Sequence, residues 1–171
     1  LDPSIKNADI EKRYAAKTGQ GIAGQPLISS LDSLYNAAVD LQTAGNDSAA
    51  LKLYLQVIEK DPQYSLAWNN LGAIYGKWGA IEQCEQAYMK AIEKRHDLPE
   101  TYANLVNLYI ELEEFAKART WLIKGQGHNP ESQMLRDLRQ KIRRFAHRHG
   151  RLRGIDIDRR HVHPEVRRDL L

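Results

Sequence analysis

Apolar residues recur at helical spacing between Ser65 and His96. The first helical face is marked by residues three, one and three positions apart: Trp68, Leu71, Gly72 and Tyr75. Gly79 interrupts this pattern, and a second face follows, marked by Cys84, Tyr88 and Ala91. Because spacings of three and four residues return to the same side of an α-helix, the stretch predicts two amphipathic helices joined by a turn at Gly79.

The same pattern occurs once before this stretch and once after it, at a constant period. The earlier copy, closed by Pro62, consists of Leu34, Ala37, Ala38, Leu41, Gly45, Ala50, Tyr54 and Val57. The later copy, closed by Pro130, consists of Tyr102, Leu105, Val106, Tyr109, Ala118, Leu122 and Gly125. Glu113 replaces the bend glycine in the later copy, so we expect a slightly different turn there. Helix–turn–helix units with a 34-residue period resemble the tetratricopeptide repeat family, and the resemblance covers residues 31 to 130.

This resemblance implies an all-α fold, a right-handed α-solenoid of three helix–turn–helix repeats. After the third repeat, one apolar seam follows an otherwise charged helix: Leu135, Leu138, Ile142 and Phe145. One apolar face and one solvated face suit the terminal cap of a repeat array. We therefore expect the following organisation: an N-terminal arm and glycine-rich linker at 1–30, repeats at 31–64, 65–98 and 99–132, a capping helix at 133–149 and an extended basic tail at 150–171.

The composition of the 171 residues fits one domain of ordinary size, with 42% hydrophobic residues. No run approaches the roughly 20 apolar residues of a membrane span, and no secretory leader is recognisable. We expect a soluble protein and favour a cytoplasmic over a periplasmic location. The single cysteine, Cys84, allows no internal disulfide and does not decide the compartment.

Charge is unevenly distributed along the chain. Residues 1–135 hold 13 Lys and Arg against 17 Asp and Glu, whereas residues 136–171 hold 12 against 5. Arginine favours bidentate pairing with carboxylate or phosphate, so we expect these arginines to anchor the chain on a partner: Arg143, Arg144, Arg148, Arg151, Arg153, Arg159, Arg160, Arg167 and Arg168. Acidic residues are interleaved and aromatic residues are scarce after Phe145, which favours an acidic protein surface over nucleic acid or an anionic membrane.

Three asparagines, Asn36, Asn70 and Asn104, occupy the same position in the first helices of the three repeats. A carboxamide both donates and accepts hydrogen bonds, so it can hold a peptide backbone without selecting its side chains. The resemblance implies that a concave groove holds an extended peptide at these asparagines and at five further positions: Tyr35, Leu66, Asn69, Asn107 and Ile110. The alternative is that asparagine is simply common at this position of the family.

Some tetratricopeptide domains bind the acidic C-terminal tails of chaperones through a clamp of lysines, arginine and asparagines. Of the corresponding positions, only Asn70 matches here. The other positions are occupied by Tyr35, Val39, Glu100 and Asn104, and Glu100 would repel a carboxylate. The pattern therefore indicates a neutral or mixed peptide.

No arrangement of residues indicates catalysis, a cofactor or a metal. Cys84 stands where the other repeats have alanine, which indicates a small buried side chain rather than a nucleophile. Two His-x-His pairs near the C-terminus lack further ligands at a fixed spacing. The sequence therefore favours a non-enzymatic adaptor or scaffold for a protein assembly. The alternatives are a nucleic-acid-associated module acting through the arginine-rich tail and a small three-repeat chaperone of the secretion type.

Overall fold

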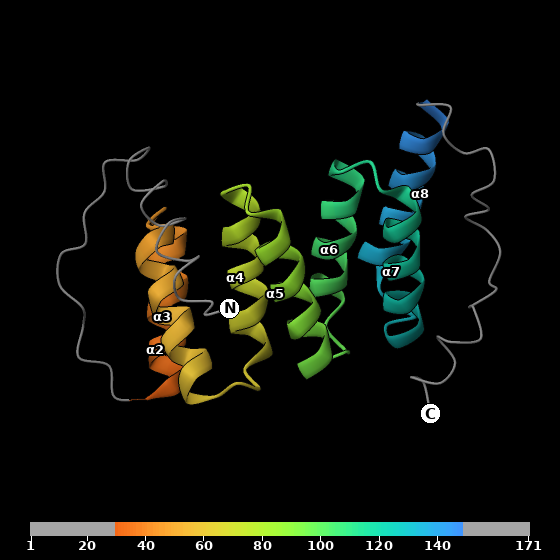
Figure 1. The fold of residues 1–171 in the computed structure, drawn as a ribbon. Coiled ribbons are helices and arrows are strands. Elements are labelled where there is room, and N and C mark those ends of the chain that lie inside the picture. The colour runs from red at the N-terminus through yellow and green to blue at the C-terminus, as the bar shows by residue number, and fades with distance from the viewer. Residues whose placement is uncertain (1–29, 149–171) are drawn as a thin grey trace. The chain divides into compact units, whose positions relative to one another are not determined.

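The computed structural model describes residues 30–148, which form seven α-helices and no strand (Figure 1). The helices are α2 (Leu31–Thr43), α3 (Asp47–Lys60), α4 (Ser65–Lys77), α5 (Ile81–Lys94), α6 (Pro99–Glu111), α7 (Phe115–His128) and α8 (Gln133–Arg148). None of these helices is long and apolar enough to cross a bilayer. The predicted N-terminal arm before Ser30 and the predicted basic tail lie outside the described residues.

The helices repeat with the predicted period. The first helix of each repeat begins at Leu31, Ser65 and Pro99, and α8 begins one further period along the chain, at Gln133. The second helices, α3, α5 and α7, likewise begin at equivalent positions of the three repeats. The all-α prediction of helix–turn–helix units is therefore confirmed, and α8 keeps the register of a further first helix.

The bends inside the three hairpins have one backbone conformation. Gly45, Gly79 and Glu113 all have positive φ angles, of 82°, 72° and 57°. Each residue donates its N–H to the carbonyl three residues earlier, and the following N–H donates to the carbonyl five residues before it. This is the Schellman pattern that ends many helices. The expectation of a different turn at Glu113 was wrong, because glutamate adopts here the left-handed conformation that glycine usually supplies.

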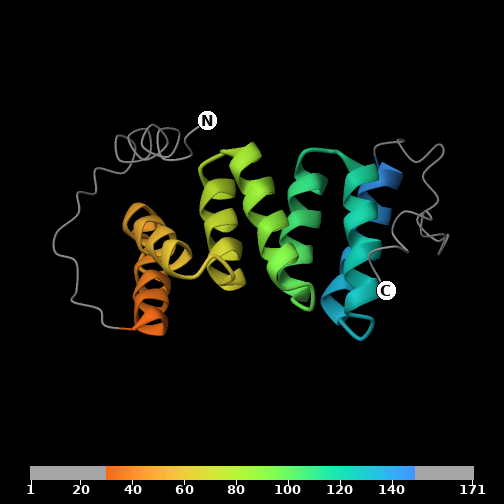
Figure 2. The same cartoon turned by 60° about the horizontal axis from the view of Figure 1, so that its bottom comes forward.

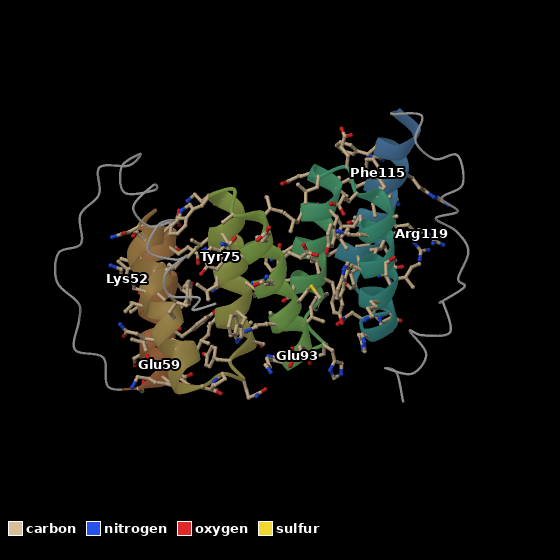
Figure 3. The ribbon with its side chains drawn as sticks, in the orientation of Figure 1. Lys52, Glu59, Tyr75, Glu93, Phe115 and Arg119 are labelled. Atoms are coloured by element: carbon tan, nitrogen blue, oxygen red, sulfur yellow. The ribbon has the colours of Figure 1, made fainter. Side chains whose placement is uncertain are left out.

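The described residues divide into two compact units, one ending at Lys94 and the other beginning at Arg95. In the first unit, α2 packs on α3, α3 on α4, and α4 on α5 (Figures 1 and 2). In the second unit, α6 packs on α7, and α8 packs on both. Figure 3 shows Tyr75, a buried residue of α4, and Glu59, an exposed residue of α3. The division falls beside the loop in which His96 replaces the closing proline.

Two glycines allow close helix packing within the units. A Cβ on Gly72 of α4 would lie 2.6 Å from the ring of Tyr88 on α5. A Cβ on Gly125 of α7 would lie 2.8 Å from the ring of Tyr102 on α6. Since real Cβ atoms do not approach other atoms this closely, the aromatic rings occupy the space that the missing side chains leave.

A charge pair joins the first hairpin to the second. Asp47 begins α3 and is buried, and its Oδ2 lies 2.5 Å from the ammonium group of Lys77 at the end of α4. The Asp47 side chain is 1% exposed, whereas that of Lys77 is 56% exposed. The lysine therefore compensates a carboxylate that is almost withdrawn from water, while keeping contact with solvent itself.

Candidate functional site

The first unit contains five of the predicted peptide-binding residues. Two lie on α2 and three on α4: Tyr35, Asn36, Leu66, Asn69 and Asn70. Asn36 is exposed, and the other four are partly buried. Tyr35 and Asn70 are joined by a hydrogen bond between α2 and α4.

Asn70 is at the centre of a hydrogen-bond network. Its Nδ2 donates to the hydroxyl of Tyr35 at 3.1 Å and to the hydroxyl of Tyr54 at 2.9 Å. Tyr54 in turn donates to Oε1 of Gln42 at 2.8 Å, and Asn69 donates to Oδ1 of Asn70 at 3.2 Å. Both amide hydrogens of Asn70 are therefore used inside the unit, so this side chain links α2, α3 and α4.

The tyrosines of the network also pack as rings. The ring of Tyr35 lies 5.8 Å from that of Tyr54 and 5.0 Å from that of Tyr64, both within the usual range for aromatic pairs. Burial raises the pKa of Tyr54 well above its ordinary value. The pKa of Tyr64 is also raised, by burial and by the carboxylate of Asp32, to which its hydroxyl donates at 3.3 Å. Both hydroxyls therefore stay neutral at physiological pH.

Two polar groups of α2 retain hydrogen-bonding capacity. Tyr35 accepts a hydrogen bond from Asn70, but within residues 30–148 its hydroxyl hydrogen has no acceptor. The neighbouring Asn36 is exposed, and its carboxamide bonds to no other residue in the same range. Tyr35 can therefore donate one hydrogen bond to a ligand, and Asn36 can both donate and accept.

The second unit holds the remaining predicted residues on α6, and they differ in their surroundings. Asn107 accepts a hydrogen bond from the ammonium group of Lys141 on α8, at 2.6 Å. Asn104 is partly buried, and Ile110 is only 3% exposed. The buried position of Ile110 leaves little of its side chain for a ligand.

The basic residues of α8 fall into two groups. Arg136 donates to Gln133 and to the backbone oxygens of Pro130 and Glu131, so it fixes the turn before α8. Arg139 donates to Gln126 on α7, which itself donates to the backbone of α8. The second group is exposed and consists of Lys141, Arg143 and Arg144. The side chain of Arg148 and the predicted anchoring arginines from Arg151 to Arg168 lie outside the described residues.

The polar contacts of three residues, Gln42, Tyr54 and Lys141, were not predicted from the sequence. Gln42 and Tyr54 have no signal there, because their partners are set by the packing of α2, α3 and α4. Lys141 does have a signal: it stands one full period after Asn107 along the chain. Continuing the repeat count into α8 would have identified it.

Cys84 is 1% exposed, as expected for a small side chain in the core of the first unit. Across residues 30–148, no three His, Cys, Asp or Glu side chains converge in a way that suits a metal ion. Within residues 30–148, neither observation points to a further candidate site.

Comparison with known proteins identifies the architecture. Residues 53–86 match the family model described as tetratricopeptide repeat. The TPR2B domain of yeast Sti1, in a complex with pHsp70, is 18% identical with a TM-score of 0.62, and the match covers 69% of this chain and 97% of that one. The Arabidopsis OM64 TPR domain is 13% identical with a TM-score of 0.60, covering 67% and 94%. The second TPR domain of human RPAP3, in complex with the HSP70 peptide SGPTIEEVD, is 17% identical with a TM-score of 0.58, covering 64% and 92%. At these identities the likeness shows the fold.

Proposed function

We propose that this chain, a tetratricopeptide repeat protein, is a non-enzymatic adaptor that holds an extended peptide segment of a partner protein on the first helices of its repeats. Two domains of similar fold, from yeast Sti1 and human RPAP3, are known in complexes with pHsp70 and an HSP70 peptide. This likeness supports protein or peptide partners as the class of ligand. The choice of residues rests on this chain alone.

The observation that carries the proposal is the spare hydrogen-bonding capacity of Tyr35 and Asn36 on α2. A peptide backbone presents carbonyl and N–H groups, with which a hydroxyl donor and a carboxamide can form hydrogen bonds. Because both groups of the peptide belong to its backbone, such contacts depend little on the peptide's sequence. Leu66 then supplies apolar contact for a side chain of the bound peptide.

Asn70 acts indirectly in this proposal. Its two N–H groups are bound to tyrosine hydroxyls, so it holds Tyr35 in place and orients the hydroxyl hydrogen away from Asn70. Asn69 donates a hydrogen bond to the side-chain oxygen of Asn70 and so helps to fix the orientation of that carboxamide. In the second unit, Asn104 and Asn107 keep the predicted role of backbone contacts. The predicted anchoring arginines, from Arg143 onward, attach to an acidic surface of the partner.

The test is selection from a library of random dodecapeptides displayed on phage, followed by calorimetry of a selected peptide against variants. We expect Tyr35→Phe and Asn36→Ala each to weaken binding by about 0.5–1.5 kcal/mol, the usual net value of one hydrogen bond. Asn70→Ala should cost at least as much as Tyr35→Phe, and combining the two should add little, because they disable the same contact.

Gln86→Ala is the matched control, since it removes an exposed carboxamide from a second helix, α5. This variant should bind as the wild type does. Two results would overturn the proposal: a library that yields no enriched peptide, or selected peptides whose affinity is unchanged by Tyr35→Phe and Asn36→Ala together while circular dichroism shows an intact fold.

A further inference from the structure

We propose that α8 extends the binding surface of the second unit and receives a carboxylate side chain of the bound peptide between Lys141 and Arg144. This inference rests on the proposed function and names the ligand chemistry that the second unit selects. It assigns to the capping helix a role in recognition in addition to its role in covering α6 and α7.

α8 is in register with α6, the first helix of the third repeat. α8 begins one full period after α6, and it packs on both α6 and α7. Lys141 stands one period after Asn107, and the two side chains are joined by a hydrogen bond of 2.6 Å. Equivalent positions of α6 and α8 therefore lie next to each other, so the polar surface of α6 continues onto α8.

Two exposed cations of α8, Lys141 and Arg144, retain N–H groups that can bind a carboxylate. The ammonium group of Lys141 has three hydrogens, and one is given to Asn107. Arg144 is exposed, and within residues 30–148 its guanidinium has no partner. Residues three apart on a helix are neighbours, so these two cations flank one position on the surface of α8. Arg136 is engaged through all three guanidinium nitrogens at the turn before α8, and Arg139 is partly buried and donates to Gln126, so we do not include either in the site.

Two exposed apolar side chains, Met134 and Phe145, lie on the same side of α8 as Lys141 and indicate the class of ligand. Met134, Leu138, Lys141 and Phe145 are spaced four, three and four apart and so lie along one side of α8. Met134 is 45% exposed and Phe145 is 37% exposed, whereas Leu138 is buried. A cation between two exposed apolar side chains complements an acidic residue flanked by apolar residues. A guanidinium pairs with a carboxylate through two parallel hydrogen bonds, which favours Asp or Glu at this position of the peptide.

The closing experiment uses the same dodecapeptide selection on the full chain. We expect the selected peptides to share one Asp or Glu next to apolar residues. Replacing that acid by its amide should weaken binding to the wild type by about tenfold or more, as for a hydrogen bond to a charged group. The same replacement in the peptide should not change its affinity for the double variant Lys141→Met and Arg144→Met. Methionine keeps an unbranched apolar side chain at both positions and removes the two charges.

The controls separate recognition from structure. Lys60→Met removes an exposed cation from α3 and should leave the preference for the acid intact. If Lys141 and Arg144 serve only to hold α8, the double variant will lose thermal stability but will still discriminate between the acid and its amide, and this overturns the inference. A fluorescein-labelled oligonucleotide of uridines, matched in length to the peptide, serves as the competing probe. Tighter binding of this RNA than of the peptide, abolished in the double variant, would also overturn it.

Failure of the inference is distinguishable from failure of the proposed function. Selected peptides that depend on Tyr35 but share no acidic residue would leave the adaptor function intact and remove the carboxylate site. A selection that enriches no peptide would remove both. If acidic peptides are enriched but bind the double variant as tightly as the wild type, their contacts lie elsewhere. This result would contradict the role of α8.

Discussion

Glu113 has the left-handed backbone conformation at the third bend, where the other two bends have Gly45 and Gly79. The hydrogen bonds around all three residues are the same, so the hairpin geometry imposes this conformation whatever the residue. For a residue with a Cβ, the left-handed region costs about 1–2 kcal/mol. The third bend therefore contains local strain that the first two bends avoid.

This strain predicts opposite effects of two substitutions. Glu113→Gly should raise the free energy of unfolding by about 0.5–1 kcal/mol, because relief of strain exceeds the added flexibility of the unfolded chain. Gly79→Ala should lower it by about 1 kcal/mol. A Cβ on Gly79 would meet nothing within 4 Å, so its cost is conformational alone. Urea unfolding followed by circular dichroism measures both, and a neutral Gly79→Ala would contradict this account.

Asn70 illustrates which part of the site could be predicted from the sequence. The period identified its position on a first helix and its equivalence to Asn36. Its hydrogen bonds could not be predicted, because the two tyrosines that it contacts lie 35 and 16 residues earlier in the chain. Only the packing of α2, α3 and α4 brings these groups together. A periodic pattern predicts which face a residue occupies but not which polar partner takes up its donors.

At the scale of elements, the helices could be predicted from the sequence because several features of the pattern indicate the same helix positions. Apolar spacing, bend residues and the constant repeat period all indicate the same hairpins, and the structure has helices at each of these positions. The division into two compact units was not predicted, since the period treats the repeats alike. Near that division His96 stands in place of the closing proline, and Pro99 begins α6 where the other first helices begin with Leu31 and Ser65.

The predicted capping role of α8, which packs on α6 and α7, leads to a prediction about its buried residues. Leu135 and Ile142 are fully buried in the second unit. Leu135→Ala and Ile142→Ala should each lower the free energy of unfolding by about 2–5 kcal/mol, because each leaves a cavity against α6 and α7. Gln140→Ala, on the exposed side of the same helix, should have little effect. Chemical unfolding and gel filtration measure stability and aggregation; equal stabilities of the three variants would show that α8 does not cap the repeats.

At the scale of the whole molecule, charge separates the chain into a weakly acidic body and a basic end. Residues 1–135 have a net charge of −4 and residues 136–171 a net charge of +7. Within the described residues the exposed cations of this basic end lie on α8, whereas the exposed charges of α2 and α6 are acidic: Asp32, Asp40, Glu100 and Glu111. A ligand therefore meets cationic side chains on α8 and acidic or neutral polar side chains on α2 and α6.

This distribution predicts how the chain treats the HSP70 peptide SGPTIEEVD, which the second TPR domain of human RPAP3 binds. Some tetratricopeptide domains clamp a terminal carboxylate. Besides Asn70, the corresponding positions of this chain hold Tyr35, Val39, Glu100 and Asn104, and none of these is cationic. Amidating the C-terminus of the peptide should therefore leave its affinity for this chain unchanged. Replacing its two glutamates by glutamine should weaken binding roughly tenfold if Lys141 and Arg144 receive a side-chain carboxylate as we propose. Fluorescence anisotropy of the labelled peptide, with the double variant Lys141→Met and Arg144→Met as control, measures both changes. A large loss on amidation would instead show that the chain recognises the terminal carboxylate.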